Sequence, residues 1–385
     1  MTAKRLTSIS SRLFRTSARW RSKALAVSCL LLFSVAGSVL LLRSMAAVPP
    51  VSAEPEAGAL SGAVAACNDT ASSGGRYVRF GAPACRTYAN PVVNANCPDP
   101  TVYQEGATYY ALCTKGEVPA FNIRTSTNLV NWTDTGKYVM PNRAPWALSQ
   151  HYWAPDLRKI GSTYVVYFTS HDVARNFLCI GTATATNIMG PYTPASQPLV
   201  CPGGKAVLDS AYFKDTDGKQ YLYWKEDLVA GNASGYLFVQ QLDASGLRFA
   251  AGTTKRQLFK NDLAWENPLV EGPWVFKRDG VYYMIYSGAV FNNASYATGV
   301  AKASSPFGPW TKKGPPILKT GTRWKGPGHG GLAQAGGVDY YVYHAWEGSN
   351  WIDVRKMMVE KINWVNGWPE INNGTPAEGQ LPYPL

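Results

Sequence analysis

The sequence predicts an all-β protein, a five-bladed β-propeller preceded by an N-terminal signal or anchor segment. Two observations carry the prediction. A marker residue, a glycine turn and a tyrosine-rich strand recur five times between residues 99 and 343, and no segment after residue 80 shows a helical period. A repeat of nearly fixed length that leaves room for four strands is typical of a propeller, whose antiparallel sheets follow one another around an axis.

Each repeat begins with an acidic residue or a histidine. In the third repeat, Asp209 precedes the turn Asp217-Gly218 and the apolar strand that starts at Tyr221. Asp-Gly between β-rich segments is a strong hairpin signal, because glycine tolerates the positive φ that such turns require. The spacings between successive markers are 57, 53, 62 and 58 residues, too long for a parallel β-helix, and a β-sandwich would not repeat a marker five times. The five markers are Asp99, Asp156, Asp209, Glu271 and His329.

Residues 1–46 form a basic segment with an apolar run, from Ala24 to Leu42, that is long enough to cross a bilayer as a helix. Ser44 and Ala46 are small and suit a signal-peptidase site, while the length of the run equally suits a retained anchor. Because the positive end stays inside, both outcomes place the remainder outside the cytoplasm. We therefore expect a secreted, extracellular protein, or one anchored by an N-terminal transmembrane helix that is its only contact with a membrane.

Residues 47–80 are predicted to be a flexible linker, and residues 81–385 the propeller that forms the catalytic domain. Eight of the positive charges lie before residue 44, which leaves about +4 of the total +12 for the rest of the chain. This mild charge gives no support to nucleic-acid binding. The six cysteines after the apolar run are an even number in an exported chain, which favours disulfides over a metal site.

Propeller geometry brings the five markers together. The first strand of each blade lies nearest the axis, so residues at the same place in every repeat are expected to meet in one central cavity. Four of the five markers are carboxylic acids. Carboxylates gathered in one cavity raise one another's pKa, and such a group can supply an acid and a base together.

Five motifs resemble glycoside hydrolase family 43, the group of arabinanases, α-L-arabinofuranosidases and β-xylosidases. The resemblance covers about residues 88–371. Each motif alone is weak, and their order and blade-like spacing make the resemblance specific. The motifs are Cys97-Pro98-Asp99-Pro100, Trp153-Ala154-Pro155-Asp156, Leu208-Asp209-Ser210-Ala211-Tyr212-Phe213, Glu271-Gly272-Pro273-Trp274 and Gly326-Pro327-Gly328-His329-Gly330-Gly331.

The resemblance implies an inverting hydrolase, in which a base activates water and an acid protonates the departing oxygen, with roughly 6.5–9.5 Å between them. It makes Asp99 the base and Glu271 the acid, while Asp209 orients Glu271 and strengthens its hold on the proton. The alternative for these three acids is that each caps backbone amides at a strand start. Asp156 is not catalytic in the family, and we expect it to be structural.

Three further residues are predicted to bind substrate. Trp153 and Trp274 each lie three positions from a marker acid, so they are expected at the cavity mouth, where a sugar stacks on an indole; wedging between blades is the alternative. The resemblance places His329 beneath the active site, in reach of a structural Ca²⁺ through water. Calcium prefers oxygen ligands, so a direct bond is not expected. The chemistry itself is predicted to need no cofactor.

The leading hypothesis is hydrolysis of α-L-arabinofuranosyl linkages in arabinan or arabinoxylan, within the wider class of plant cell-wall pentosides. A β-xylosidase acting on xylo-oligosaccharides is the alternative from the same family. A non-catalytic carbohydrate-binding propeller has no need of a facing acid and base, and a protein-interaction platform leaves the acidic convergence unexplained. The expected partner is a polysaccharide or oligosaccharide, and the protein is expected to be a monomer.

Overall fold

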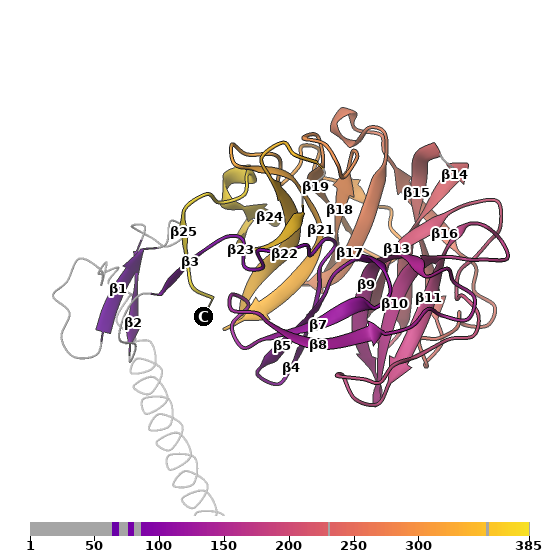
Figure 1. Ribbon diagram of the computed structural model, residues 1–385. Helices are drawn as coiled ribbons and strands as arrows, with labels where there is room; N and C mark the ends of the chain where they lie inside the picture. Colours follow the sequence, from indigo (N-terminus) through magenta and orange to yellow (C-terminus); the bar gives the residue numbers. More distant parts are fainter. Residues whose placement is uncertain (1–63, 69–75, 81–85, 230–231, 352–353, 385) are drawn as a thin grey trace, which may run out of the picture. The chain divides into compact units, whose positions relative to one another are not determined.

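The computed structural model describes residues 64–68, 76–80, 86–229, 232–351 and 354–384. As predicted, the chain is nearly all β and forms a five-bladed propeller, and Figure 1 shows the sheets following one another in chain order. The predicted segment 1–46 lies outside the described residues. Within the part of the chain that is described, no helix is both long and apolar enough to cross a bilayer.

The N-terminal unit, residues 1–83, is separate from the unit of residues 84–385. In it, strands β1 (Val64–Asn68) and β2 (Arg76–Phe80) pair antiparallel. Both strands lie inside the stretch 47–80 that the sequence analysis treated as a linker. The boundary after residue 83 falls close to the propeller start expected at residue 81.

Each blade is an antiparallel sheet whose strands are neighbours in the sequence. Four blades have four strands and one has five. The first blade contains β4 (Thr101–Glu105), β5 (Thr108–Leu112), β7 (Ala120–Ser126) and β8 (Thr133–Met140). The second contains β9 (Gln150–Ile160), β10 (Thr163–His171), β11 (Leu178–Ala185) and β12 (Thr193–Pro194), with β6 (Lys115–Glu117) added to β9.

The remaining three blades repeat the four-stranded plan. The third contains β13 (Val207–Lys214), β14 (Gln220–Val229), β15 (Asn232–Leu242) and β16 (Arg256–Lys260). The fourth contains β17 (Val270–Arg278), β18 (Val281–Gly288), β19 (Ala297–Ala303) and β20 (Thr311–Lys312), with the 3₁₀ turn η3 (Ala264–Glu266) before it. The fifth contains β21 (Trp324–Ala335), β22 (Val338–Glu347), β23 (Arg355–Val365) and β24 (Trp368–Ile371), followed by the 3₁₀ turn η4 (Asn372–Gly374).

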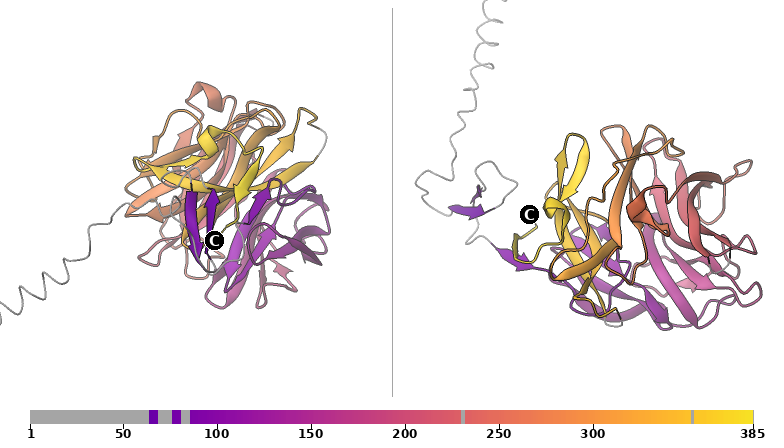
Figure 2. Two further views of the ribbon diagram at one scale, coloured as in Figure 1. Left: turned by 90° about the vertical axis from the view of Figure 1, so that its left-hand side faces the viewer. Right: turned by 90° about the horizontal axis from the view of Figure 1, so that it is seen from above.

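The first strands of the blades form a closed ring, in which β4, β9, β13, β17 and β21 each contact their neighbours and β21 contacts β4. The two ends of the propeller fasten this closure. Strand β3 (Thr87–Ala89) pairs with β25 (Gln380–Pro382), and Asn90 exchanges hydrogen bonds with Val359 of the fifth blade. Figure 2 shows the first and last blades side by side.

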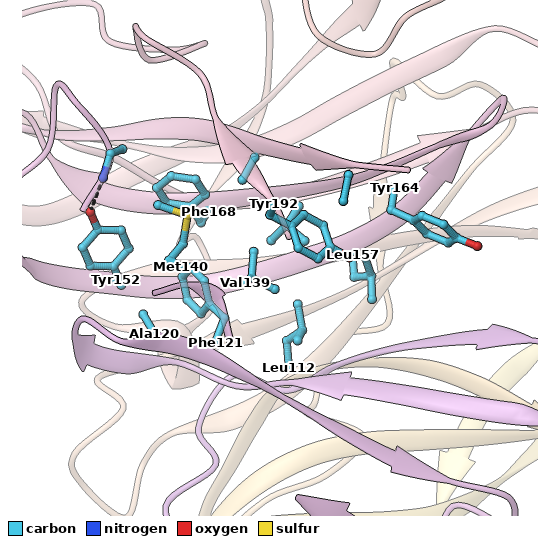
Figure 3. Close-up of a cluster of buried hydrophobic side chains, with 14 of the residues drawn as sticks. Leu112, Ala120, Phe121, Val139, Met140, Tyr152, Leu157, Tyr164, Phe168 and Tyr192 are labelled. Carbon is cyan, nitrogen blue, oxygen red and sulfur yellow. Dashed lines mark hydrogen bonds between the residues drawn. The ribbon is translucent and has the colours of Figure 1, made fainter. Parts of the chain in front are cut away.

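The hydrophobic core lies between adjacent blades. Figure 3 shows one such cluster, in which Phe121 of the first blade packs on Tyr152 and Phe168 of the second. The buried phenol of Tyr152 accepts a hydrogen bond of 2.9 Å from the Ala144 amide. Burying large aromatic side chains between sheets stabilises the ring, because each removes much apolar area from water.

Candidate active site

A bulged tetrapeptide interrupts the inner strand of four blades, and in the first blade the equivalent residues lie just before β4. In β9, β13, β17 and β21, three residue steps on the inner strand are paired with two on the next strand. The second residue of each tetrapeptide has a positive φ, which is unusual outside glycine. These second residues, with the equivalent position before β4, are Asp99 (50°), Ala154 (45°), Asp209 (58°), Gly272 (55°) and His329 (43°).

The bulge decides which side chains face the axis cavity, whose volume is about 240 Å³. First or second residues of all five tetrapeptides line it, and no fourth residue does. The cavity is lined by Asp99, Thr114, Trp153, Leu208, Asp209, Glu271, Phe291, His329 and Arg355. The structure therefore brings together the three predicted catalytic acids, together with Trp153 and His329.

Asp156 and Trp274 occupy fourth positions and lie further along the inner strands. The Asp156 carboxylate accepts hydrogen bonds from the Tyr212 amide (2.7 Å) and the Thr101 hydroxyl (3.3 Å), and it pairs with Arg158 at 2.8 Å. The Arg158 guanidinium lies 4.2 Å from the centroid of the Trp274 ring. These contacts join four blades, and we call Asp156, Arg158 and Trp274 the axial plug.

This arrangement corrects the expected positions of Asp156 and Trp274. Asp156 was expected in the cavity with the other markers, and Trp274 was expected at its mouth. Instead, a Cβ added to Gly331 of the fifth blade would lie 2.7 Å from the Trp274 ring, so the indole wedges between blades. The physical reason is the bulge, which turns the first and fourth residues of a tetrapeptide in different directions.

Asp99 is buried and is surrounded by nitrogen atoms. One carboxylate oxygen lies 2.8 Å from Arg355 Nη1 and 3.2 Å from His329 Nδ1. Burial alone would raise the pKa of Asp99, but the charges of Arg355 and His329 outweigh it and hold the pKa well below its ordinary value. The disulfide between Cys97 and Cys113 holds the turn that carries Asp99 against the end of β5.

Two histidines contact Asp99, and they differ in charge. Burial lowers the pKa of His344 to about 4, so its ring is neutral, and its Nδ1 accepts the Asp99 backbone N–H at 3.1 Å. Burial also opposes the charging of His329, but Asp209 and Asp99 outweigh it and raise the pKa of His329 to about 9. His329 therefore contributes a positive charge to the cavity at neutral pH.

Asp209 is a cavity carboxyl group whose pKa lies far above its ordinary value. Burial, with a smaller effect of the Glu271 charge, raises the pKa of Asp209 to about 7 although His329 opposes the shift. One of its oxygens accepts the Gly272 N–H at 3.2 Å, and its own N–H donates to Thr169. Gly272 has to be glycine, because a Cβ there would lie 2.8 Å from the His329 ring.

Glu271 is held on both carboxylate oxygens. The Tyr296 hydroxyl donates to Oε1 at 2.8 Å, and the ammonium of Lys225 lies 3.5 Å from Oε2. Lys225 is itself buried and also lies 3.1 Å from Asp227. Burial would lower the pKa of Lys225, but Glu271 and Asp227 outweigh it and raise the value, so the ammonium stays charged.

Sequence reasoning missed several residues that complete the site, among them Thr114, Lys225, Phe291 and Arg355. One signal was available for Lys225, because a lysine directly after the apolar run Tyr221-Leu222-Tyr223-Trp224, within the same strand, needs a charged partner inside the protein. Arg355 and Phe291 lie in segments without any motif, and they meet only in space, with the guanidinium 4.7 Å from the Phe291 ring centroid.

Three residues near the axis could offer ligands to a cation. Asp209, Glu271 and His329 each offer a ligand atom, and these atoms lie within 4.8 Å of one another. Two of the three donors are oxygens, as Ca²⁺ prefers, but the charges of Lys225 and His329 already compensate the carboxylates. The protein groups thus fit a protonated imidazole better than a directly bound Ca²⁺, and the water-mediated ion at His329 stays a prediction.

Comparison with known proteins gives a consistent result. The sequence model described as "Glycosyl hydrolases family 43" matches residues 88–369. A β-D-galactofuranosidase from Aspergillus niger is 28% identical over 66% of this chain and 75% of its own length. An extracellular exo-α-(1→5)-L-arabinofuranosidase from Streptomyces avermitilis is 26% identical over 77% of this chain and 65% of its own length.

The fold comparison agrees with the sequence comparison. The crystal structure of a thermostable family-43 glycoside hydrolase superposes with a TM-score of 0.69 at 26% identity. The match covers 78% of this chain and 99% of that one.

Proposed function

The chain belongs to glycosyl hydrolase family 43, and from this premise we propose that it is an inverting hydrolase of plant cell-wall pentosides, with α-L-arabinofuranosyl linkages as its first substrate class. It is a glycosyl hydrolase of polysaccharides or oligosaccharides. The finer assignment is supported by the name of the Streptomyces relative, an exo-α-(1→5)-L-arabinofuranosidase that matches 77% of this chain. A β-xylosidase acting on xylo-oligosaccharides is the alternative.

One observation carries the proposed chemistry: carboxyl groups that differ in proton affinity line one small cavity. Arg355 and His329 keep Asp99 ionised, as a base must be. Across the ring of inner strands, Glu271 lies beside Asp209, whose pKa is raised to about 7. We assign the role of the acid to Glu271 from its place in the motif Glu271-Gly272-Pro273-Trp274, and Asp209 retains a proton in the same part of the cavity up to about neutral pH.

In the proposed reaction, Asp99 takes a proton from a water molecule as the water oxygen forms its bond to the anomeric carbon. On the other side of the sugar, Glu271 donates its proton to the departing glycosidic oxygen as the C–O bond breaks. The products are a free sugar of inverted configuration and a shortened chain or alcohol. Asp99 then returns its proton to solvent and Glu271 regains one.

The neighbouring groups have defined parts in this proposal. Arg355 and His329 hold the Asp99 carboxylate through one oxygen, so that it points in a fixed direction. The Tyr296 hydroxyl fixes Glu271, and Lys225 stabilises the carboxylate that remains after the proton has left. A water-linked Ca²⁺ at His329 would add positive charge beneath the cavity.

The size of the cavity limits what reacts there. A volume of about 240 Å³ is smaller than the ~300–1,000 Å³ of pockets that enclose drug-sized ligands. It suits a single sugar unit, with Trp153 offering an indole face for stacking. We also propose that the protein acts outside the cell, as its Streptomyces relative is named extracellular.

A panel of substrates tests the proposed function. The protein is incubated with arabinan, arabinoxylan, xylo-oligosaccharides, and the nitrophenyl glycosides of arabinofuranose, xylopyranose and galactofuranose, and the released sugar is measured. We expect the fastest release from arabinofuranosides. Faster release from xylosides would favour the alternative, and no release from any substrate would contradict a catalytic role.

Stereochemistry and leaving-group dependence test the mechanism. Proton NMR of the first sugar formed should show inversion, and retention would overturn the role of Asp99. Glu271→Ala should impair natural oligosaccharides far more than a dinitrophenyl pentoside, whose leaving group needs no proton. Equal loss on both would show that Glu271 is not the acid.

A further inference from the structure

A second cavity adjoins the proposed catalytic one, and the two share a wall. It is an open hollow of about 440 Å³, more exposed to solvent than the catalytic cavity of about 240 Å³, and Gly116, Glu117 and Gln150 on its rim are exposed. Trp153 lines both, so the two spaces meet at its side chain. The second cavity is lined by Lys115, Gly116, Glu117, Gln150, His151 and Trp153.

Strand β6 builds this second cavity. It belongs in sequence to the first blade, but it pairs with β9 of the second, with Lys115 opposite Tyr152 and Glu117 opposite Gln150. No other blade has a fifth strand among the described residues. The additional strand places the polar residues Lys115 and Glu117 beside Trp153, at one side of the catalytic cavity.

The residues that line the second cavity combine an aromatic ring with hydrogen-bonding groups, as sugar-binding sites do. His151 packs edge-on against the Trp153 ring, with centroids 5.1 Å apart, and this contact helps to orient the indole. Lys115 and Gln150 supply donors, and Gln150 and Glu117 supply acceptors. An indole face beside mixed donors and acceptors suits a sugar ring, which has apolar faces and hydroxyl groups around its edge.

The charges in the second cavity balance. Lys115 is positive and Glu117 is negative, while burial and the nearby His171 lower the pKa of His151 and keep that ring neutral. The Lys115 ammonium lies 5.1 Å from the centroid of the Tyr138 ring, a contact that restrains it. A cavity of balanced charge favours a neutral ligand over an acidic or basic one.

We propose that the second cavity is a subsite for a further neutral sugar unit of the same chain whose neighbouring unit occupies the catalytic cavity. The inference rests on the proposed function and extends it. The preferred substrate is then an oligosaccharide or polysaccharide that spans both cavities across Trp153. A simple aryl pentoside uses the catalytic cavity alone for its sugar.

The test compares two substrates in one variant. The double variant Lys115→Ala/Gln150→Ala removes donors that would bind sugar hydroxyls, and each lost hydrogen bond costs about 0.5–1.5 kcal/mol. We expect kcat/KM for a trisaccharide or longer substrate to fall by roughly 5- to 100-fold. The nitrophenyl pentoside should be hydrolysed at the wild-type rate. Its aryl ring has no hydroxyl groups, so it makes no hydrogen bonds that depend on Lys115 or Gln150.

A second variant fills the second cavity instead of removing its hydrogen-bond donors. A Cβ added at Gly116 would meet nothing within 4 Å, so Gly116→Trp places an indole in the second cavity without a backbone clash. Gly379→Trp is the matched control, since a Cβ there also meets nothing and it lies outside both cavities. Gly116→Trp should raise KM for the oligosaccharide, and the control should not.

The outcomes separate the subsite from the proposed function. Hydrolysis of the aryl pentoside by the wild-type protein establishes the catalytic cavity independently. Unchanged oligosaccharide kinetics in both variants would overturn the subsite, as would an equal loss on both substrates in the double variant. Failure of the wild-type protein on every substrate would instead overturn the proposed function.

Discussion

Two tetrapeptides on inner strands of this propeller both carry an acid and a tryptophan at their ends, but in opposite order. Trp153-Ala154-Pro155-Asp156 in β9 and Glu271-Gly272-Pro273-Trp274 in β17 share the same bulge, the same positive φ at the second residue and proline at the third. In each, the first residue faces the cavity and the fourth joins the axial plug. The acid and the tryptophan have exchanged places between the two.

The exchange shows that position within the bulge determines what each side chain does. Asp156 and Glu271 are both buried acids on inner strands. Asp156 is satisfied by three partners that tie blades together, whereas Glu271 opens onto a cavity. Trp153 and Trp274 differ in the same way, one at a cavity wall and one wedged between blades. We therefore expect changes in the cavity to affect catalysis and changes in the plug to affect stability.

The largest effect should come from the proposed base. Asp99→Asn keeps the shape of the side chain but leaves water without a proton acceptor, so kcat/KM should fall by roughly 10²–10⁴-fold on every substrate. Thermal stability should fall as well, because Asp99 pairs with Arg355 and His329, so kcat/KM is measured on the folded protein. Asp156→Asn is the matched control in the plug, and it should retain turnover in the folded protein. Similar losses of activity in both variants would break the comparison.

The next largest effect should be on stability. Asp156→Ala leaves the Arg158 guanidinium in the plug without its carboxylate, and removing one partner of a buried ion pair costs about 3–5 kcal/mol. The urea-unfolding midpoint should fall accordingly, while kcat of the folded enzyme on an aryl pentoside stays within a few-fold of wild type. Adding Arg158→Met should recover part of the stability. If the double variant recovers none, the pair is not the source of the cost.

A third buried acid sharpens the comparison, because Glu360 pairs with no cation among the described residues and lines neither cavity. It accepts hydrogen bonds from Tyr343 and Ala377, and burial raises its pKa to about 7. Between the ordinary value and about 7, the folded protein retains a proton that the unfolded chain has released. Stability contributed at this site is therefore lost as pH rises through that window.

Glu360→Gln replaces the carboxyl group with an amide that does not ionise, so the variant does not lose stability at this site as pH rises. The variant should be more stable than wild type at about pH 8, by about 1–3 kcal/mol, and the difference should shrink towards pH 4. Urea unfolding of both proteins across this range measures it. A difference that stays constant with pH would mean that the effect is packing and not protonation.

The smallest effect is a shift within the cavity itself. Asp209, whose pKa is raised to about 7, carries its negative charge on the alkaline side of the pH–rate profile, and Asp209→Asn removes that charge from beside the proposed acid. The alkaline limb of the profile should then move to lower pH. Asp215→Asn, a buried acid paired with Lys277 outside the cavity, is the control and should leave the limb unchanged. A shift to higher pH would contradict the proposed role of Asp209.

Much of the fold could be predicted from the sequence, because five copies of one strand pattern are visible without any structure. The convergence of Asp99, Asp209, Glu271 and His329 followed from the repeat alone. The disulfides Cys97–Cys113 and Cys179–Cys201 confirm the predicted pairing for four of the six body cysteines, although the sequence could not choose the partners. Cys67 and Cys85 lie outside the described side chains, and their pairing stays a prediction. The segment 1–46 was predicted from composition and stays a prediction.

The repeat and the identity of its marker residues were determined by the sequence alone, since hydrophobic pattern and turn chemistry are local properties. Which marker faces the cavity was decided only by tertiary structure. The direction of a side chain at a bulge depends on how the inner strand pairs with the next one, and Asp156 joins the plug because it is the fourth residue of its tetrapeptide. The charges that separate Asp99 from Asp209 also come from distant strands, because Arg355, Lys225 and His329 reach the carboxylates only when the ring closes.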